Sequence, residues 1–319
     1  MELSAEKTAP TGLVSFRLEP VLDRKNWRAV SLQIPRRRRT AHEYLSTTLF
    51  FVIHAAPVMM LVYPPTWRLG VLAIASYVIR MWAITVGYHR FFAHRSFRTS
   101  RVFRFMLGFL GASAMQNGPI WWASWHRAHH KHSDKPGDPH SPVRGGFWHA
   151  HIGWFFDGSH EVPDLSNVRD LTRVPELRFL EKYNWLPIAL WMLGCYAIAG
   201  TAGILWGFVI PTIAVLHLTA AVNSLAHTWG TRRFDTDDDS RNNGFLALLT
   251  LGEGWHNNHH FYMSSARQGL MWWELDVSYY TIKLLSLLRI VRDVRPPRHF
   301  LESVARQSAL ERRPLRSAA

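Results

Sequence analysis

The chain has 319 residues, a formal net charge of +14 and one cysteine, Cys195. This length allows one large domain or two small ones, and a single cysteine excludes an intrachain disulfide and any cysteine-ligated zinc or iron–sulfur site. The composition, 48% hydrophobic and 19% charged, hides a division into very apolar and very basic stretches.

Residues 1–40 are polar, broken by prolines, and end in the basic run Arg36 to Arg39. They lack the early apolar core of a signal peptide, so we expect none. A run of arginines can bind nucleic acid, anionic lipid or an acidic partner, but directly before an apolar segment it is more typical of a topology anchor. We therefore predict a flexible basic arm over residues 1–40 and no nucleic-acid partner.

Four apolar segments follow, at residues 44–63, 69–88, 185–199 and 205–223. A helix needs about 20 apolar residues to cross a bilayer, and the uncharged run 183–230 is long enough for two. Pro64-Pro65 and Gly200 to Gly203 would form the turns. The sequence predicts an all-α integral membrane fold with four transmembrane helices in two hairpins. His54, in the middle of the first span, is interpreted as a neutral imidazole bonded to a neighbouring helix.

Both turns are too short to hold a domain, so the remaining mass lies on one side of the membrane. We predict a helical cap from residues 89–182 and 227–295, which completes a membrane domain over residues 41–295, and a tail over residues 296–319. Basic residues such as Arg90 and Arg95 favour the cytoplasm for this side and for both termini. The acidic run at residues 235–239 is interpreted as a solvated loop.

Three histidine boxes lie in this cap or at its boundary: His89-Arg-Phe-Phe-Ala-His94, His126-Arg-Ala-His129-His130 and His256-Asn-Asn-His259-His260. The last two have the spacing i, i+3, i+4, which projects three imidazoles from one face of a helix. Imidazole suits Fe, Zn, Cu and Ni, so eight convergent histidines predict more than one transition-metal ion. His89 and His94 face one site only if their helix bends, tightens or ends between them.

Four further residues are candidates near these boxes. Asn223 and His227 are spaced i, i+4 and share a face, so His227 is a ninth candidate ligand and Asn223 a candidate to hold a bridging water. Asp134 and Asp138 follow the second box; ligating histidines usually donate their other N–H to a carboxylate, although loop-turn chemistry explains the pair equally well.

Other metal chemistries fit the sequence less well. A histidine-lined transporter would carry its ligands inside the spans, whereas these lie at or beyond the cytoplasmic ends. A carboxylate di-iron bundle needs two Glu-x-x-His motifs, and only Glu253-Gly-Trp-His256 is present. No His-Glu-x-x-His occurs, which removes the common zinc protease.

Residues 41–295 resemble the integral-membrane fatty-acid desaturase family, and more closely its acyl-CoA Δ9 (stearoyl-CoA desaturase-like) branch. The resemblance rests on the three boxes, with Gly252-Glu-Gly-Trp before His256, and on Asn223-Ser-Leu-Ala-His227. It implies two iron ions held by the nine histidines and no catalytic side chain beyond this centre. It also implies that O₂ and two electrons insert a cis double bond into a saturated acyl chain, at Δ9 and on coenzyme A. Gln116, Trp122 and Thr219 match the residues that bend the acyl tunnel.

No His-Pro-Gly-Gly heme motif of a fused cytochrome b5-like module occurs, as in bacterial members. We therefore expect a bacterial inner membrane and a separate electron donor: a ferredoxin, a rubredoxin, a cytochrome b5-like protein or a reductase. The acyl carrier could also be another carrier or a membrane lipid. Histidine boxes alone leave one alternative open, a membrane hydroxylase or ketolase that acts on an alkane, a sterol or a carotenoid.

Overall fold

The structure of the protein is a computed structural model that describes residues 41–157 and 163–297. The chain divides into residues 1–31 and residues 32–319, and every described residue belongs to the second unit. The predicted arm over residues 1–40 and nearly all of the predicted tail lie outside the described residues.

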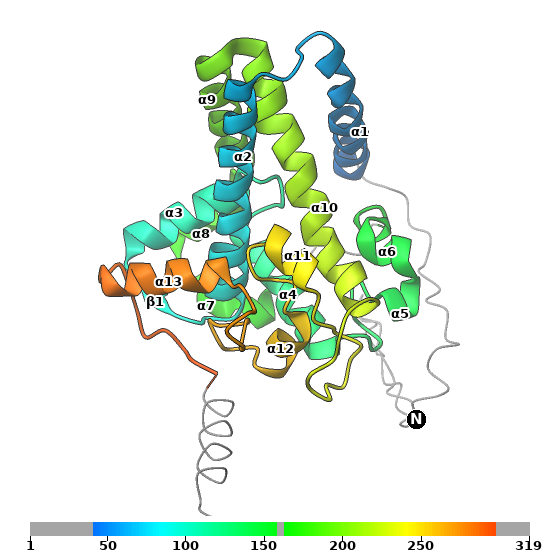
Figure 1. Ribbon diagram of the computed structural model, residues 1–319, viewed down its shortest axis with the longest axis vertical. Coiled ribbons are helices and arrows are strands. Elements are labelled where there is room, and N and C mark those ends of the chain that lie inside the picture. The colour runs from blue at the N-terminus through cyan, green and yellow to red at the C-terminus, as the bar shows by residue number, and fades with distance from the viewer. Residues whose placement is uncertain (1–40, 158–162, 298–319) are drawn as a thin grey trace, which may run out of the picture. The chain divides into compact units, whose positions relative to one another are not determined.

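The described chain is mostly helical (Figure 1), as predicted. In the first half the helices are α1 (Ala41–Ala55), η2 (Ala56–Leu61), α2 (Trp67–Trp82), η3 (Ala83–Ala93), α3 (Arg101–Ala112), α4 (Pro119–His132), α5 (Pro142–Gly145), α6 (Phe147–His151) and η4 (Gly153–Phe155). The second half contains η5 (Leu165–Val168), α7 (Arg169–Thr172), α8 (Pro175–Lys182), α9 (Trp185–Ile204), η6 (Leu205–Val209), α10 (Ile210–Ser224), η7 (Leu225–His227), α11 (Gly244–Leu249), α12 (His256–Phe261) and α13 (Val277–Leu287).

Two very short strands, β1 (Arg98–Thr99) and β2 (Val291–Arg292), form an antiparallel pair. Arg98 lies opposite Arg292, and Thr99 lies opposite Val291. The sequence did not predict this pair, because two residues are too few to show the alternation of a strand. The pair joins the chain after the second apolar helix to the end of the cap.

Three helical segments are long and apolar enough to cross a membrane: Tyr44–Leu61, Trp67–Ala93 and Trp185–His227. The third has 43 residues and contains a break in helical geometry at Ala199 and Gly200. Gly200 has φ +59° and ψ −144°, a conformation that is essentially restricted to glycine. The chain folds back there, since a β-carbon on Gly203 would lie 2.0 Å from the carbonyl oxygen of Cys195.

Arg80, near the middle of the second apolar segment, is fully buried between helices. Its guanidinium donates to the Thr212 hydroxyl (2.6 Å) and the Phe208 carbonyl (3.1 Å) and lies over the ring of Trp191. A charge inside a membrane span needs such partners, and here they fix α2 against η6 and α10.

The main hydrophobic core surrounds the lower part of the second span in Figure 1, where η3, α3, α4 and α8 pack together. Tyr88, Leu107, Ile120 and Leu180 are at most 3% exposed. Gly111 is required in this contact, because a β-carbon there would lie 2.2 Å from the Tyr88 ring. This core holds the ends of η3 and α4 side by side, and both carry histidine boxes.

Candidate metal centre

His89 and His94 lie at the end of the second apolar helix, where the helix widens. Over Ala83–Ala93 it has π geometry, and the His94 N–H donates to the His89 carbonyl at 3.0 Å. This i→i+5 pattern stacks residues five apart on one side of the helix, and the two ring centroids lie 4.7 Å apart. The helix also ends at Ala93, between the two histidines, which is one of the predicted alternatives; it widens before this end and does not tighten.

The other two boxes lie on the short helices α4 and α12, in the predicted helical spacing. On α4, His126 and His130 face one way and His129, at i+3, contributes to a neighbouring group. On α12, His259 joins the group of His126 and His130, whereas His256 and His260 join the group of His129. Each helix therefore supplies ligand candidates to two adjacent groups.

Nine histidines form these two groups. The five-histidine cluster consists of His89, His94, His126, His130 and His259; the four-histidine cluster consists of His129, His227, His256 and His260. Within each cluster, one ring nitrogen per residue lies within 4.8 Å of the others. The nine histidines of the sequence analysis, and no others, make up both clusters within the described residues. A further group joins His129 to Asp138 and His140.

The arrangement fits transition-metal ions. In the five-histidine cluster Nε2 atoms face one another, at 2.8 Å for His94 and His126 and at 3.0 Å for His130 and His259. In the four-histidine cluster the buried Nε2 of His260 has no hydrogen-bond partner. Buried polar atoms are rarely left without a partner, and a metal ion bound by these lone pairs would provide one.

Four of these rings contact a carboxylate through their Nδ1 atom. Nδ1 contacts carboxylate oxygens at 2.5 Å (His89 and Glu253), 2.9 Å (His129 and Asp138), 2.8 Å (His227 and Asp134) and 2.6 Å (His260 and Asp238). A carboxylate that accepts from Nδ1–H fixes the tautomer that leaves Nε2 free to bind a metal.

Burial keeps most of these imidazoles in the neutral, metal-binding form. Burial, and then the neighbouring imidazoles, lower the pKa of His94, His126, His130 and His259 well below its usual value. His129 differs from these four. Burial lowers its pKa, but the carboxylates of Asp138, Asp134 and Asp238 together outweigh burial, and the net shift is upward.

Comparison with known proteins identifies the family. Residues 65–283 match the family model of the fatty acid desaturases. The chain is 39% identical over 260 residues to an "Acyl-CoA C20 Delta5-desaturase" of Anemone leveillei, which covers 79% of this chain and 83% of the relative. The chain belongs to the fatty acid desaturase family.

Two further relatives of this desaturase are named for lipid-bound substrates. It is 37% identical to "Delta-9 acyl-lipid desaturase 2" of Arabidopsis thaliana, over 82% of this chain and 85% of the relative. It is also 37% identical to "sn-1 stearoyl-lipid 9-desaturase" of Anabaena variabilis, over 79% and 93%. The predicted class of enzyme, an oxidoreductase that desaturates acyl chains, is confirmed.

The sequence analysis of the desaturase did not predict that two of the four carboxylates, Asp238 and Glu253, would contact the histidine rings. Asp238 belongs to the acidic run interpreted as a solvated loop. Asp235 and Asp237 are indeed exposed, but the interpretation was wrong for Asp238, which bonds His260, and the Asp239 N–H bonds Asp134. Nothing in the sequence distinguishes Asp238 from its acidic neighbours. Glu253 offered a signal, since it lies three residues before His256, but it was considered only as a metal ligand.

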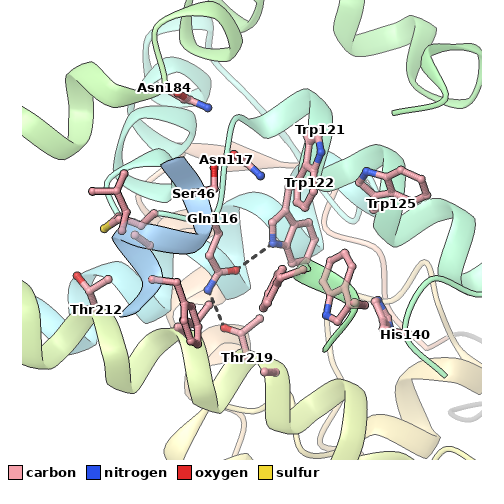
Figure 2. Close-up of a pocket in the computed structure, with 18 of the residues that line it drawn as sticks. Ser46, Gln116, Asn117, Trp121, Trp122, Trp125, His140, Asn184, Thr212 and Thr219 are labelled. Atoms are coloured by element: carbon pink, nitrogen blue, oxygen red, sulfur yellow. Dashed lines mark hydrogen bonds between the residues drawn. The ribbon is translucent and has the colours of Figure 1, made fainter. Parts of the chain in front are cut away.

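A cavity of about 480 Å³ reaches the five-histidine cluster at His126. Gln116, Trp122 and Thr219 meet in its wall: the Trp122 Nε1–H donates to Gln116 (3.1 Å), whose amide donates to Thr219 (3.0 Å), as Figure 2 shows. The Trp122 ring stacks on His126, with centroids 4.9 Å apart. Asn223, the residue expected to hold a water, also lines the cavity.

Proposed function

We propose that the desaturase binds two iron ions, one in each histidine cluster, and uses them with O₂ to form a cis Δ9 double bond in a saturated acyl-CoA. The observation that carries this proposal is the pair of adjacent histidine clusters, one of which reaches the cavity at His126. The ions would supply the oxidising power needed to take hydrogen from an unactivated methylene, which amino-acid side chains lack.

The overall reaction balances when two electrons come from outside. A –CH₂–CH₂– unit, O₂, two electrons and two protons give –CH=CH– and two waters. The electrons would come from a separate protein. We also propose Asp134 and Asp138 as supports of the ligand rings, with Glu253 and Asp238 in the same role, and Asn223 as the holder of a water.

The cavity would select the carbon atoms that react. Gln116, Trp122 and Thr219 narrow the cavity beside His126, so a bound chain would bend there and present one pair of methylenes to the cluster. Support for position 9 comes from the two relatives named as 9-desaturases, whereas the Anemone relative is named for position 5. The relatives are named as desaturases, which disfavours the hydroxylase or ketolase alternative.

The bend at Ala199 and Gly200 supports four membrane crossings in two hairpins, because it divides the third apolar segment into two helical arms. We propose that residues 41–295 form the membrane domain, with its cap and both termini in the cytoplasm. The membrane would be a bacterial inner membrane.

The test is analysis of membrane fatty acids by gas chromatography and mass spectrometry, with double bonds located by derivatisation. Cells that express the chain should contain a new cis Δ9 monounsaturated acid, and cells that express His129→Ala should not. A hydroxylated product, or the same product from both, would reject the proposal.

A further inference from the structure

Three histidines outside both clusters form a hydrogen-bonded chain beside the cavity. His54 Nε2 on α1 lies 2.9 Å from His217 Nε2 on α10, and His217 Nδ1 lies 3.1 Å from His151 Nε2 on α6. The chain ends where His151 Nδ1 lies 2.9 Å from the Ser224 hydroxyl. These contacts join α1 and α10, which both line the cavity, to α6.

The hydrogen bonds of this chain require no charge. The Phe50 carbonyl can only accept, so His54 Nδ1–H donates to it (2.6 Å) and His54 Nε2 is left as an acceptor. His217 Nε2–H then donates to His54, and His217 Nδ1 accepts from His151 Nε2–H. Three neutral rings therefore satisfy the contacts among the three histidines and the contact with Phe50, which suits a site inside a membrane span.

Little else holds α1 in place. The window Tyr44–Leu61 is 0% buried. The bond between His54 and His217 is the one side-chain hydrogen bond that joins residues 44–55, as far as the structure describes them, to another element. Phe50 adds an edge-on contact with Phe156, with ring centroids 5.1 Å apart.

This weakly held helix is nevertheless a wall of the cavity. The cavity is lined on this side by Ser46, Thr47, Leu49, Phe50 and Ile53. Ser46 and Leu49 are also exposed on the outer surface, and Leu49 is 46% exposed. Both belong to a segment that is apolar enough to cross the membrane, so this wall separates the cavity from lipid.

We propose that α1 is a movable side wall, held closed by the hydrogen bond between His54 and His217, and that acyl chains enter the cavity sideways from the bilayer. This inference rests on the proposed function, since it concerns the same cavity. Its ligand is a long acyl chain that lies in the membrane leaflet. Such a chain is offered by an inserted acyl-CoA and by a glycerolipid, because both keep their polar head at the interface.

A reversible cross-link tests the movement. Cysteines replace His54 and His217 in a Cys195→Ala background, and a reagent that links two thiols and is cleaved by reductant joins them in lipid nanodiscs. Cross-linking should lower turnover at least about tenfold for stearoyl-CoA, for a stearoyl phosphatidylcholine, or for both, and reduction should restore it. The single variants His54→Cys and His217→Cys, treated alike, are the controls.

A second measurement needs no activity. The wall residue Ala114 is 1% exposed and lines the cavity, so Ala114→Cys reports on its opening. His54→Leu should raise the rate at which a lipid-soluble maleimide modifies this cysteine about threefold, the effect of one lost interhelical hydrogen bond. Thr48→Val is the matched control, because the Thr48 hydroxyl bonds only the Tyr44 carbonyl of its own helix.

The outcomes separate the two proposals. Loss of turnover with one substrate alone supports sideways entry and names that substrate as its source. Unchanged turnover of both substrates after complete cross-linking, or an unchanged modification rate in His54→Leu, overturns the movable wall. No desaturation by the parent protein before cross-linking instead rejects the proposed function, while the modification rate still tests the wall.

Discussion

Asp134 and His227, 93 positions apart in the sequence, meet in a buried hydrogen bond of 2.8 Å between the Asp134 carboxylate and Nδ1 of His227. Burial alone would raise the pKa of Asp134, but His227, the Ser141 hydroxyl and the Asp239 N–H together outweigh burial, and the pKa falls below its usual value. Asp134 also accepts from the Ser141 hydroxyl and the Asp239 N–H, so its orientation is fixed. His227 is thereby held with Nε2 toward the four-histidine cluster.

Asp134→Asn should weaken metal binding in the four-histidine cluster about 10- to 100-fold, because the charge that holds the His227 ring and its tautomer is lost. Titration of the metal-free protein with Fe(II) measures this. Asp237→Asn is the control, since the Asp237 side chain is 74% exposed. Equal affinities in wild type and Asp134→Asn would show that Asp134 is only a loop residue.

Glu253→Gln should destabilise the protein by about 3 kcal/mol, because it breaks a buried ion cluster. Glu253 contacts His89 at 2.5 Å and Arg90 at 3.1 Å, and Arg90 also pairs with Asp276 at 2.8 Å. Unfolding in detergent followed by denaturant titration measures the loss. Asp293→Asn breaks an exposed pair with Arg98 and should cost less than about 1 kcal/mol. Similar costs for both variants would contradict this account of Glu253.

Trp122→Ala should shift the position of the double bond or the preferred chain length, because it removes the ring that lines the cavity and stacks on His126. We expect the ratio of products to change about tenfold, as for other changes in the shape of an apolar pocket. Mass spectrometry of the products checks this. Trp148→Ala, at a tryptophan that is 71% exposed, should leave the ratio unchanged. An unaltered profile in Trp122→Ala would exclude its role in positional selectivity.

Much of the site could be predicted because its spacing is local. The i, i+3, i+4 pattern on α4 and α12 fixes which imidazoles share a helix face, and His227 could be found from its spacing to Asn223. How the nine histidines divide could not be predicted, since it depends on how η3, α4, η7 and α12 pack. Asp238 and Glu253 join the site through tertiary contacts that no sequence period records.

In the fold, too, local features could be predicted from the sequence and features that depend on tertiary contacts could not. Apolar length predicted the helical spans, and Gly200 to Gly203 marked the region of the bend, although the break itself lies at Ala199 and Gly200. The π geometry of η3, which packs against α3 and α4, was not predicted from the sequence. The pair β1 and β2 forms because the cap brings two distant segments together.

Deletion of residues 1–30 should leave the metal content intact, because every residue of both clusters lies in the unit of residues 32–319. Metal analysis of the purified truncated protein checks this, with the full chain prepared in parallel. A truncated protein that is folded but free of metal would show that the predicted arm has a part in the site.

The most direct test of the two-cluster account is the iron content of the purified desaturase, loaded anaerobically with Fe(II) and measured by elemental analysis and Mössbauer spectroscopy. The account predicts two iron ions per chain in nitrogen-rich sites, and one ion in a His256→Ala variant, which keeps the five-histidine cluster whole. A single iron site in the wild type, or loss of all iron from a folded His256→Ala variant, would contradict it.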